Sequence, residues 1–199
     1  LVRSLAGWFL KAPKWETKIR MGYLLYAHAE HAHELTGKLD EMRGGNRHVS
    51  IDPDLEKACE ELLHAPDAPR FLEGYAAAAA ELAAAYREFI AQADASANAP
   101  EIRLFRRIAA DAEREARDLA RNEDAEDGAE RRNPWADYVR HLFAAAGGVS
   151  GMRDKPDRAA ARPVDSRFEW PSPIVFDDRL KHSELGRYED KVVLPPRER

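Results

Sequence analysis

The chain has 199 residues, of which 44% are hydrophobic and 34% are charged, and its net charge is -5 at pH 7. That length suits one domain of ordinary size with additional chain. The acidic balance and the lack of a long basic stretch exclude the charge pattern typical of a nucleic-acid-binding surface. No run approaches the ~18 apolar residues that a membrane-spanning helix needs. We therefore expect no nucleic-acid partner and no membrane-spanning segment.

The single cysteine, Cys59, rules out a disulfide within the chain. A chain of this kind fits a reducing compartment, so we expect a cytoplasmic location. The sequence begins at Leu1 rather than at a methionine and ends in a proline-rich segment that no helix closes. We expect that either a start segment was removed or the chain is a fragment, and that the C-terminal end is also an interruption.

Six segments have the periodicity and the end signals of α-helices. Asp52 and Pro53 form a helix start, because an aspartate caps the free amide groups and proline suits the first helical position. Gly44 and Gly147 follow helical patterns and stop them. The helical patterns cover residues 1–11, 14–43, 53–63, 70–94, 100–123 and 134–146.

These patterns predict an all-α fold, an antiparallel four-helix bundle with an extra amphipathic helix and an extended C-terminal arm. In the extra helix, Trp135, Val139 and Phe143 belong to one apolar stripe at helical spacing. The expected division is a bundle at 1–123, a charged linker at 124–133, a docking helix at 134–148, and an arm or linker rich in proline and arginine at 149–199.

The segment Y-A-H-A-E-H-A-H-E-L at residues 26–35 carries three of the seven histidines. At about 100° per residue, His28 lies at the centre of the main apolar face of its helix, and His31 lies at the edge of that face. Glu30 and His33 point to the opposite side, which also carries Ile19, Tyr23 and Tyr26. The pair with the better prospect of burial is therefore His28 and His31, which can bind a metal through neutral imidazoles or can be satisfied core residues.

A metal bound by these histidines needs carboxylates from the other helices. The inward faces of the alanine-rich helix and of helix 100–123 carry no acid. We expect Glu113 and Glu115 at the edge of the inward face of helix 100–123. Glu81, on the alanine-rich helix, lies about a quarter-turn or more from the inward face of that helix. The candidate metal ligands are His28, His31 and Glu115, with Glu30, His33, Glu81 and Glu113 as alternates. Alternatively, Glu30 and His33 form an ordinary polar pair within one helix.

Three stretches, L-L-Y-A-H-A-E-H-A-H-E-L, F-L-E-G-Y-A-A-A-A-A-E-L-A-A-A-Y and R-L-F-R-R-I-A-A-D-A-E-R-E-A-R-D-L, resemble helices of the ferritin-like superfamily over roughly residues 8–123. The resemblance places His28 at an acid position and keeps a histidine at His31. In the last helix it places Ala112 at the acid position and Glu115 at the histidine position. The family implies iron or manganese as cofactors and iron oxidation, iron storage or oxygen-activating oxidation as activities. It also implies a partner bundle, either another copy or a second ferritin-like domain.

Two functions follow as hypotheses. The first is a non-catalytic or weakly metal-binding ferritin-like module for assembly, in which the alanine-rich and aromatic surfaces contact a partner copy or second domain. The second is an iron- or manganese-dependent oxidoreductase in which His28 and His31 bind one metal ion with one of the candidate glutamates. A third, a small-molecule-binding bundle without a metal, is neither favoured nor excluded by the sequence.

Overall fold

The computed structural model describes residues 1–44, 52–120, 134–156 and 160–175. Within these ranges every regular element is a helix, which confirms the all-α prediction. None of the described helices is both long and apolar enough to cross a membrane. The charged linker 124–133 and the end of the arm, from residue 176, lie outside the described residues. The helices are α1 Val2–Lys11, α2 Trp15–Glu41, α3 Pro53–Leu63, α4 Ala68–Gln92, α5 Ala99–Ala120 and α6 Pro134–Ala145.

Side-chain caps set the starts of two helices. The carboxylate of Asp52 accepts hydrogen bonds from the backbone N–H groups of Asp54 and Leu55, at 2.9 and 3.2 Å. Asp67 does the same for the N–H of Arg70 at 2.9 Å. The sequence predicted the first of these caps; the second begins α4 at Ala68, two residues before the expected start.

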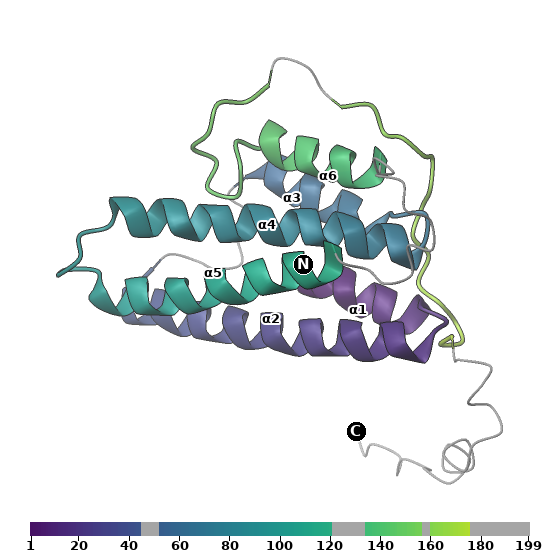
Figure 1. The fold of residues 1–199 in the computed structure, drawn as a ribbon, viewed down its shortest axis with the longest axis horizontal. Coiled ribbons are helices and arrows are strands. Elements are labelled where there is room, and N and C mark those ends of the chain that lie inside the picture. Colours follow the sequence, from purple (N-terminus) through teal and green to yellow (C-terminus); the bar gives the residue numbers. More distant parts are fainter. Residues whose placement is uncertain (45–51, 121–133, 157–159, 176–199) are drawn as a thin grey trace, which may run out of the picture.

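Helix α4 lies in the middle of the molecule, with α3 and α6 on one side and α5, α2 and α1 on the other (Figure 1). Its run Ala76–Ala79 is buried, because these small side chains let α5 and α6 approach closely. We expected the alanine-rich surface to be available to a partner; that expectation is wrong, since its own chain covers it. In α6, Trp135, Val139 and Phe143 are buried as the stripe predicted.

Helix α2 is joined to α1 by a buried lysine. The ammonium of Lys18 donates hydrogen bonds to the carbonyls of Phe9 and Leu10, at 2.5 and 3.3 Å. These carbonyls belong to the last turn of α1, where the helix dipole favours a positive charge. Burial lowers the pKa of Lys18 below its ordinary value. The contact fixes the sharp reversal of the chain between α1 and α2.

The described part of the arm crosses the ends of α3 and α1. Its anchor is Phe168, which is buried against Trp8, with ring centroids 5.6 Å apart. The N–H of Phe168 donates to Nδ1 of His64 at 2.9 Å, and the hydroxyl of Ser166 donates to the His64 carbonyl at 2.5 Å. A side chain at Gly7 would leave no room for this anchor, since a Cβ atom there would lie 2.9 Å from the ring of Phe168.

The substitution Gly7→Ala should therefore displace the arm and destabilise the protein by about 1–3 kcal/mol, as overpacking does. The matched control is Gly37→Ala in α2, where an added Cβ would meet nothing within 4 Å. An alanine in that helix should stabilise by about 0.5–1 kcal/mol. Urea unfolding measures both, and limited proteolysis reports whether the arm is released. Equal stability and equal protection of the arm in Gly7→Ala would contradict this packing.

Candidate functional site

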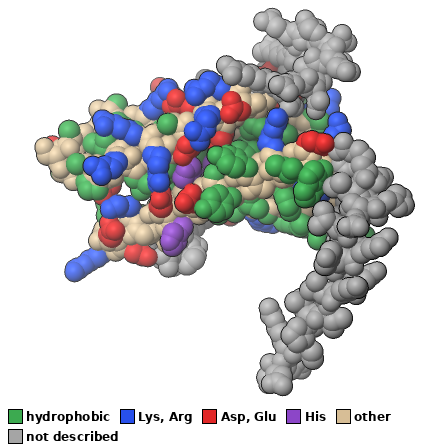
Figure 2. All heavy atoms as spheres, turned by 60° about the horizontal axis from the view of Figure 1, so that its bottom comes forward, with side chains coloured by type: hydrophobic (Ala, Val, Ile, Leu, Met, Phe, Trp, Pro, Cys, Tyr) green, Lys and Arg blue, Asp and Glu red, His purple; other side chains and the backbone are tan. Residues whose placement is uncertain are grey.

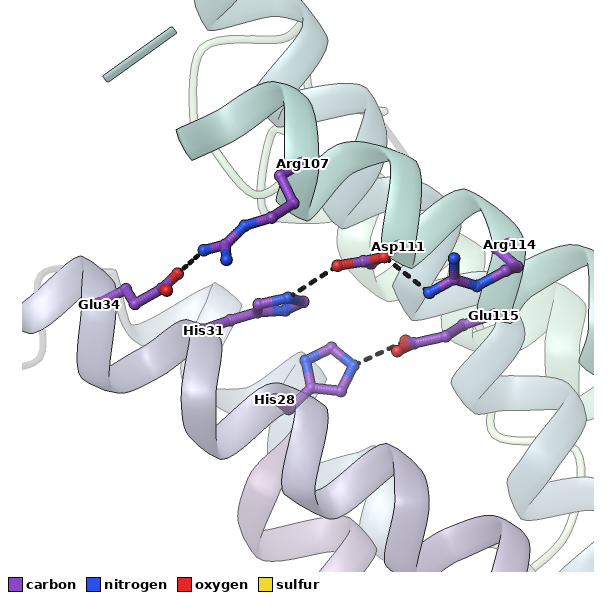
Figure 3. A network of polar contacts seen from close by, with 7 residues as sticks. All are labelled: His28, His31, Glu34, Arg107, Asp111, Arg114 and Glu115. Carbon is purple, nitrogen blue, oxygen red and sulfur yellow. Dashed lines mark hydrogen bonds and ion pairs between the residues drawn. The ribbon is translucent and has the colours of Figure 1, made fainter. Parts of the chain in front are cut away.

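Two buried histidines of α2 face two carboxylates of α5. Nε2 of His28 lies 2.9 Å from Oε2 of Glu115, and Nε2 of His31 lies 3.1 Å from Oδ2 of Asp111 (Figure 3). The histidines are three residues apart and the acids four, so each pair of like residues occupies neighbouring turns of one helix face. We call these four residues the His–carboxylate cluster. It joins α2 to α5 by two parallel polar bridges.

The cluster is deeply buried at one end and open at the other. His28 and Glu115 are 6% and 5% exposed, whereas the Asp111 side chain is 23% exposed. Asp111 also accepts from Arg114 at 2.7 Å, and Arg107 pairs with Glu34 at the rim (Figure 3). The guanidinium groups of Arg107 and Arg114 therefore lie at the exposed end of the cluster.

Two polar atoms beside the cluster have no hydrogen-bond partner among the described residues: Nδ1 of His31 and the hydroxyl of Tyr75. The Tyr75 ring meets the His28 ring edge-on at a centroid distance of 5.6 Å. Burial, followed by the nearby charge of Glu115, raises the pKa of Tyr75 well above its ordinary value. The phenol is therefore held in its neutral form.

Of the candidate ligands, the structure brings together His28, His31 and Glu115. The placement of Glu115 corrects the expectation that acids lie only at the edge of the inward face of this helix. The apolar stripe of α5 covers α4, but the neighbouring part of the same helix faces α2, so the buried arc is wider than one stripe. Ala112 lies within that arc and is buried.

The alternates lie elsewhere. Glu30 and His33 are exposed on the outer side of α2. Glu81 pairs with Arg153, from the segment after α6, at 2.7 Å. Glu113 pairs with Arg87 of α4 at 2.5 Å. None of these four contributes to the cluster.

Asp111 belongs to the cluster and was not among the sequence candidates. A signal for it exists, because two histidines one turn apart on one helix require partners about one turn apart on the facing helix. Asp111 and Glu115 are the buried or half-buried acids of α5 with that spacing. The rotation of α5 about its axis, which selects this pair, is set by its packing on α4.

Imidazole and carboxylate are ligands that iron and manganese accept. In the described residues, however, no group of three or more His, Cys, Asp or Glu side chains is placed to hold one ion. Each histidine is engaged by its own carboxylate, so the four side chains form two separate pairs. The atoms that could bind an ion contact one another, so a bound ion would require both pairs to open.

The opposite side of α2 carries an exposed apolar row. Trp15, Ile19, Tyr23 and Tyr26 are 48%, 56%, 61% and 67% exposed, at helical spacing along one line. We call this row the α2 ridge. Figure 2, in which the bottom of Figure 1 is turned forward, shows hydrophobic side chains gathered mainly in the right-hand half of the described surface and most charged side chains in the left-hand half. The sequence indicated this second face through Ile19, Tyr23 and Tyr26, and these three side chains are exposed among the described residues.

Two open hollows lie on the outer surface. One, of about 300 Å³, lies between α4 and α5 and includes Arg87 and Glu113. The other, of about 440 Å³, lies between α6 and the arm and includes Tyr138 and His141. Neither is lined by residues of the cluster, and both are too open to resemble the enclosed aromatic cavity that a small-molecule-binding bundle needs.

Comparison with known proteins gave no family model that matches the chain, and no match among curated proteins or solved structures.

The cluster yields a direct prediction for stability. Removing the carboxylate in Glu115→Ala leaves the buried imidazole of His28 without its partner, which should cost about 1–3 kcal/mol. Glu113→Ala, which removes a half-exposed acid of the same helix, should change stability by less than about 0.5 kcal/mol. Urea unfolding of both variants makes the comparison. Equal effects would show that the His28–Glu115 contact does not stabilise the fold.

Proposed function

We propose that this chain is a non-catalytic, ferritin-like helical module for protein assembly, and that it docks through the outer face of α2. The observation that carries this proposal is the α2 ridge. Large apolar side chains exposed singly are common on protein surfaces, but a contiguous row is typical of an interaction site. Tyrosine and tryptophan are also enriched in the cores of protein interfaces.

The His–carboxylate cluster has a structural part in this proposal. The buried residues of α2 are Lys18, Met21, Leu24, His28 and His31. Beyond His31 no residue of the helix is buried, so the two polar pairs are the last interior contacts of α2. They fix the rotation of the helix and, with it, the direction in which the ridge faces.

A second function is supported by the chemistry of the same cluster. Two imidazoles and two carboxylates lie together, and Nδ1 of His31 has no partner among the described residues. These groups are the ligand types of an iron- or manganese-dependent oxidoreductase, with His28, His31 and Glu115 as ligands. The pairwise arrangement of the groups makes this the weaker of the two proposals.

Metal loading separates the two functions. After incubation with Fe(II) or Mn(II) and removal of free ions, the assembly module should retain well under one ion per chain, measured by inductively coupled plasma mass spectrometry. One or two ions per chain, lost in His28→Ala and His31→Ala, would favour the oxidoreductase. The control is His33→Ala, which removes an exposed histidine of the same helix and reveals adventitious surface binding.

The docking face is tested by photocrosslinking in the native host. The crosslinking amino acid p-benzoylphenylalanine, placed at position 23 on the ridge, should give one discrete product that mass spectrometry identifies. The same amino acid at position 103, an exposed site on α5, should give none. If neither position gives a defined product, the ridge is not a docking face.

A further inference from the structure

We infer that residues 176–199 bind the outer face of α2 in their own chain, over Ile19, Tyr23 and Tyr26, and that a docking partner has to displace them. This inference rests on the proposed function and adds the regulation of the same site. Four features support it: the place where the described arm ends, the packing of α1 on α2, the sequence of the segment, and its charge.

The described arm ends at the junction of α1 and α2 (Figure 1). The N–H of Val175 donates a hydrogen bond to the carbonyl of Leu10 at 3.2 Å, and the ammonium of Lys18 donates to the same carbonyl at 3.3 Å. Val175 and α2 thus share one hydrogen-bond acceptor. Since Lys18 is followed by Ile19, which is 56% exposed, the segment leaves the described arm at the start of these three exposed side chains.

The packing of α1 on α2 brings this junction close to the other two side chains. A Cβ atom at Gly22 would lie 3.4 Å from the ring of Phe9, so the last turn of α1 lies against the turn of α2 that carries Tyr23. Along α2, Ile19 and Tyr26 are separated by about 10 Å at 1.5 Å per residue. An extended chain covers that distance with about three residues, and the segment offers many more.

The segment carries apolar side chains at a spacing that suits this face. Phe176 and Leu180 are four residues apart, which places them on one side of the chain whether it is extended or helical. Ile19 and Tyr23 have the same spacing. Because Phe176 directly follows Val175, its ring can reach α2 without an intervening linker.

Charge at the junction complements the start of the segment. Residues 11–20 carry four basic side chains and one acidic side chain, Glu16. Phe176 is followed by two acids, Asp177 and Asp178. Complementary charge of this kind steers the association of two surfaces.

The covalent connection favours this segment over a partner in solution. A short connection holds a ligand at a millimolar effective concentration, so a contact that is too weak to form between separate molecules is occupied within one chain. The segment therefore covers the face when no partner is present. A partner binds when it contributes enough contact to displace the segment.

Photocrosslinking of the purified full chain tests the cover. The amino acid p-benzoylphenylalanine at position 23 should give a product that joins α2 to residues 176–199. In a mixture of ¹⁴N- and ¹⁵N-labelled chains, a contact within one chain gives no mixed-isotope peptide pairs. The same amino acid at position 103, an exposed site on α5, should give no product with residues 176–199. Mixed-isotope pairs from position 23, or no product with that segment, would overturn the inference.

The double substitution Phe176→Asp and Leu180→Asp should uncover the face. Nitration of Tyr23 and Tyr26 by tetranitromethane, followed by peptide mass spectrometry, should then be faster by roughly threefold or more, because the intramolecular contact is lost. Tyr86, half-buried on α4, is the internal control and should react at the same rate in both proteins. Circular dichroism verifies that the variant is folded. Equal nitration of Tyr23 in the wild type and the variant would contradict the cover.

Crosslinking from position 23 in the native host separates this inference from the proposed function. A host product that becomes more abundant in the double variant supports both. A host product of equal abundance in the wild type and the double variant overturns the inference and leaves the assembly module standing. A crosslink to residues 176–199 without any host product, even in the double variant, overturns the proposed function and the regulation inferred from it.

Discussion

The burial of two imidazoles in α2 is the constraint on which the rest of this structure depends. A buried polar group without a hydrogen bond destabilises a protein, so His28 and His31 need partners from whatever helix covers them. Asp111 and Glu115 supply those partners from α5, at 3.1 and 2.9 Å. Because each bridge joins one turn of α2 to one turn of α5, the two bridges, together with the packing of α2 on α1, restrict the rotation of α2.

That rotation determines which side of α2 remains exposed. The cluster occupies the inner side, and the α2 ridge and the exposed pair Glu30 and His33 consequently face outward. The same contacts that would be needed for a metal centre are thus engaged in orienting a surface helix. The polar contacts of the buried cluster thus help to orient α2 so that the apolar side chains of the ridge face outward.

The ferritin-like resemblance and the structure differ in where they place the acids of α5. It assigns the acid position of the last helix to Ala112, which is buried and cannot bind a metal. The acids that do face the histidines are Asp111, one residue earlier, and Glu115, at the expected histidine position. Pairing each acid with one histidine gives both imidazole Nε2 atoms a partner without an ion, whereas Nδ1 of His31 has none among the described residues.

The sequence by itself determined the helices, because periodicity, proline, glycine and capping residues act over a few neighbouring positions; the Asp52 cap and the buried stripe of α6 are examples. It also separated the two sides of α2, placing His28 and His31 opposite Glu30 and His33. Only the tertiary structure decided that Asp111 and Glu115 meet the histidines, that Lys18 joins α2 to α1, and that Phe168 fills the space above Gly7. These contacts join residues from different elements and depend on how each helix is rotated and packed, which local spacing does not encode.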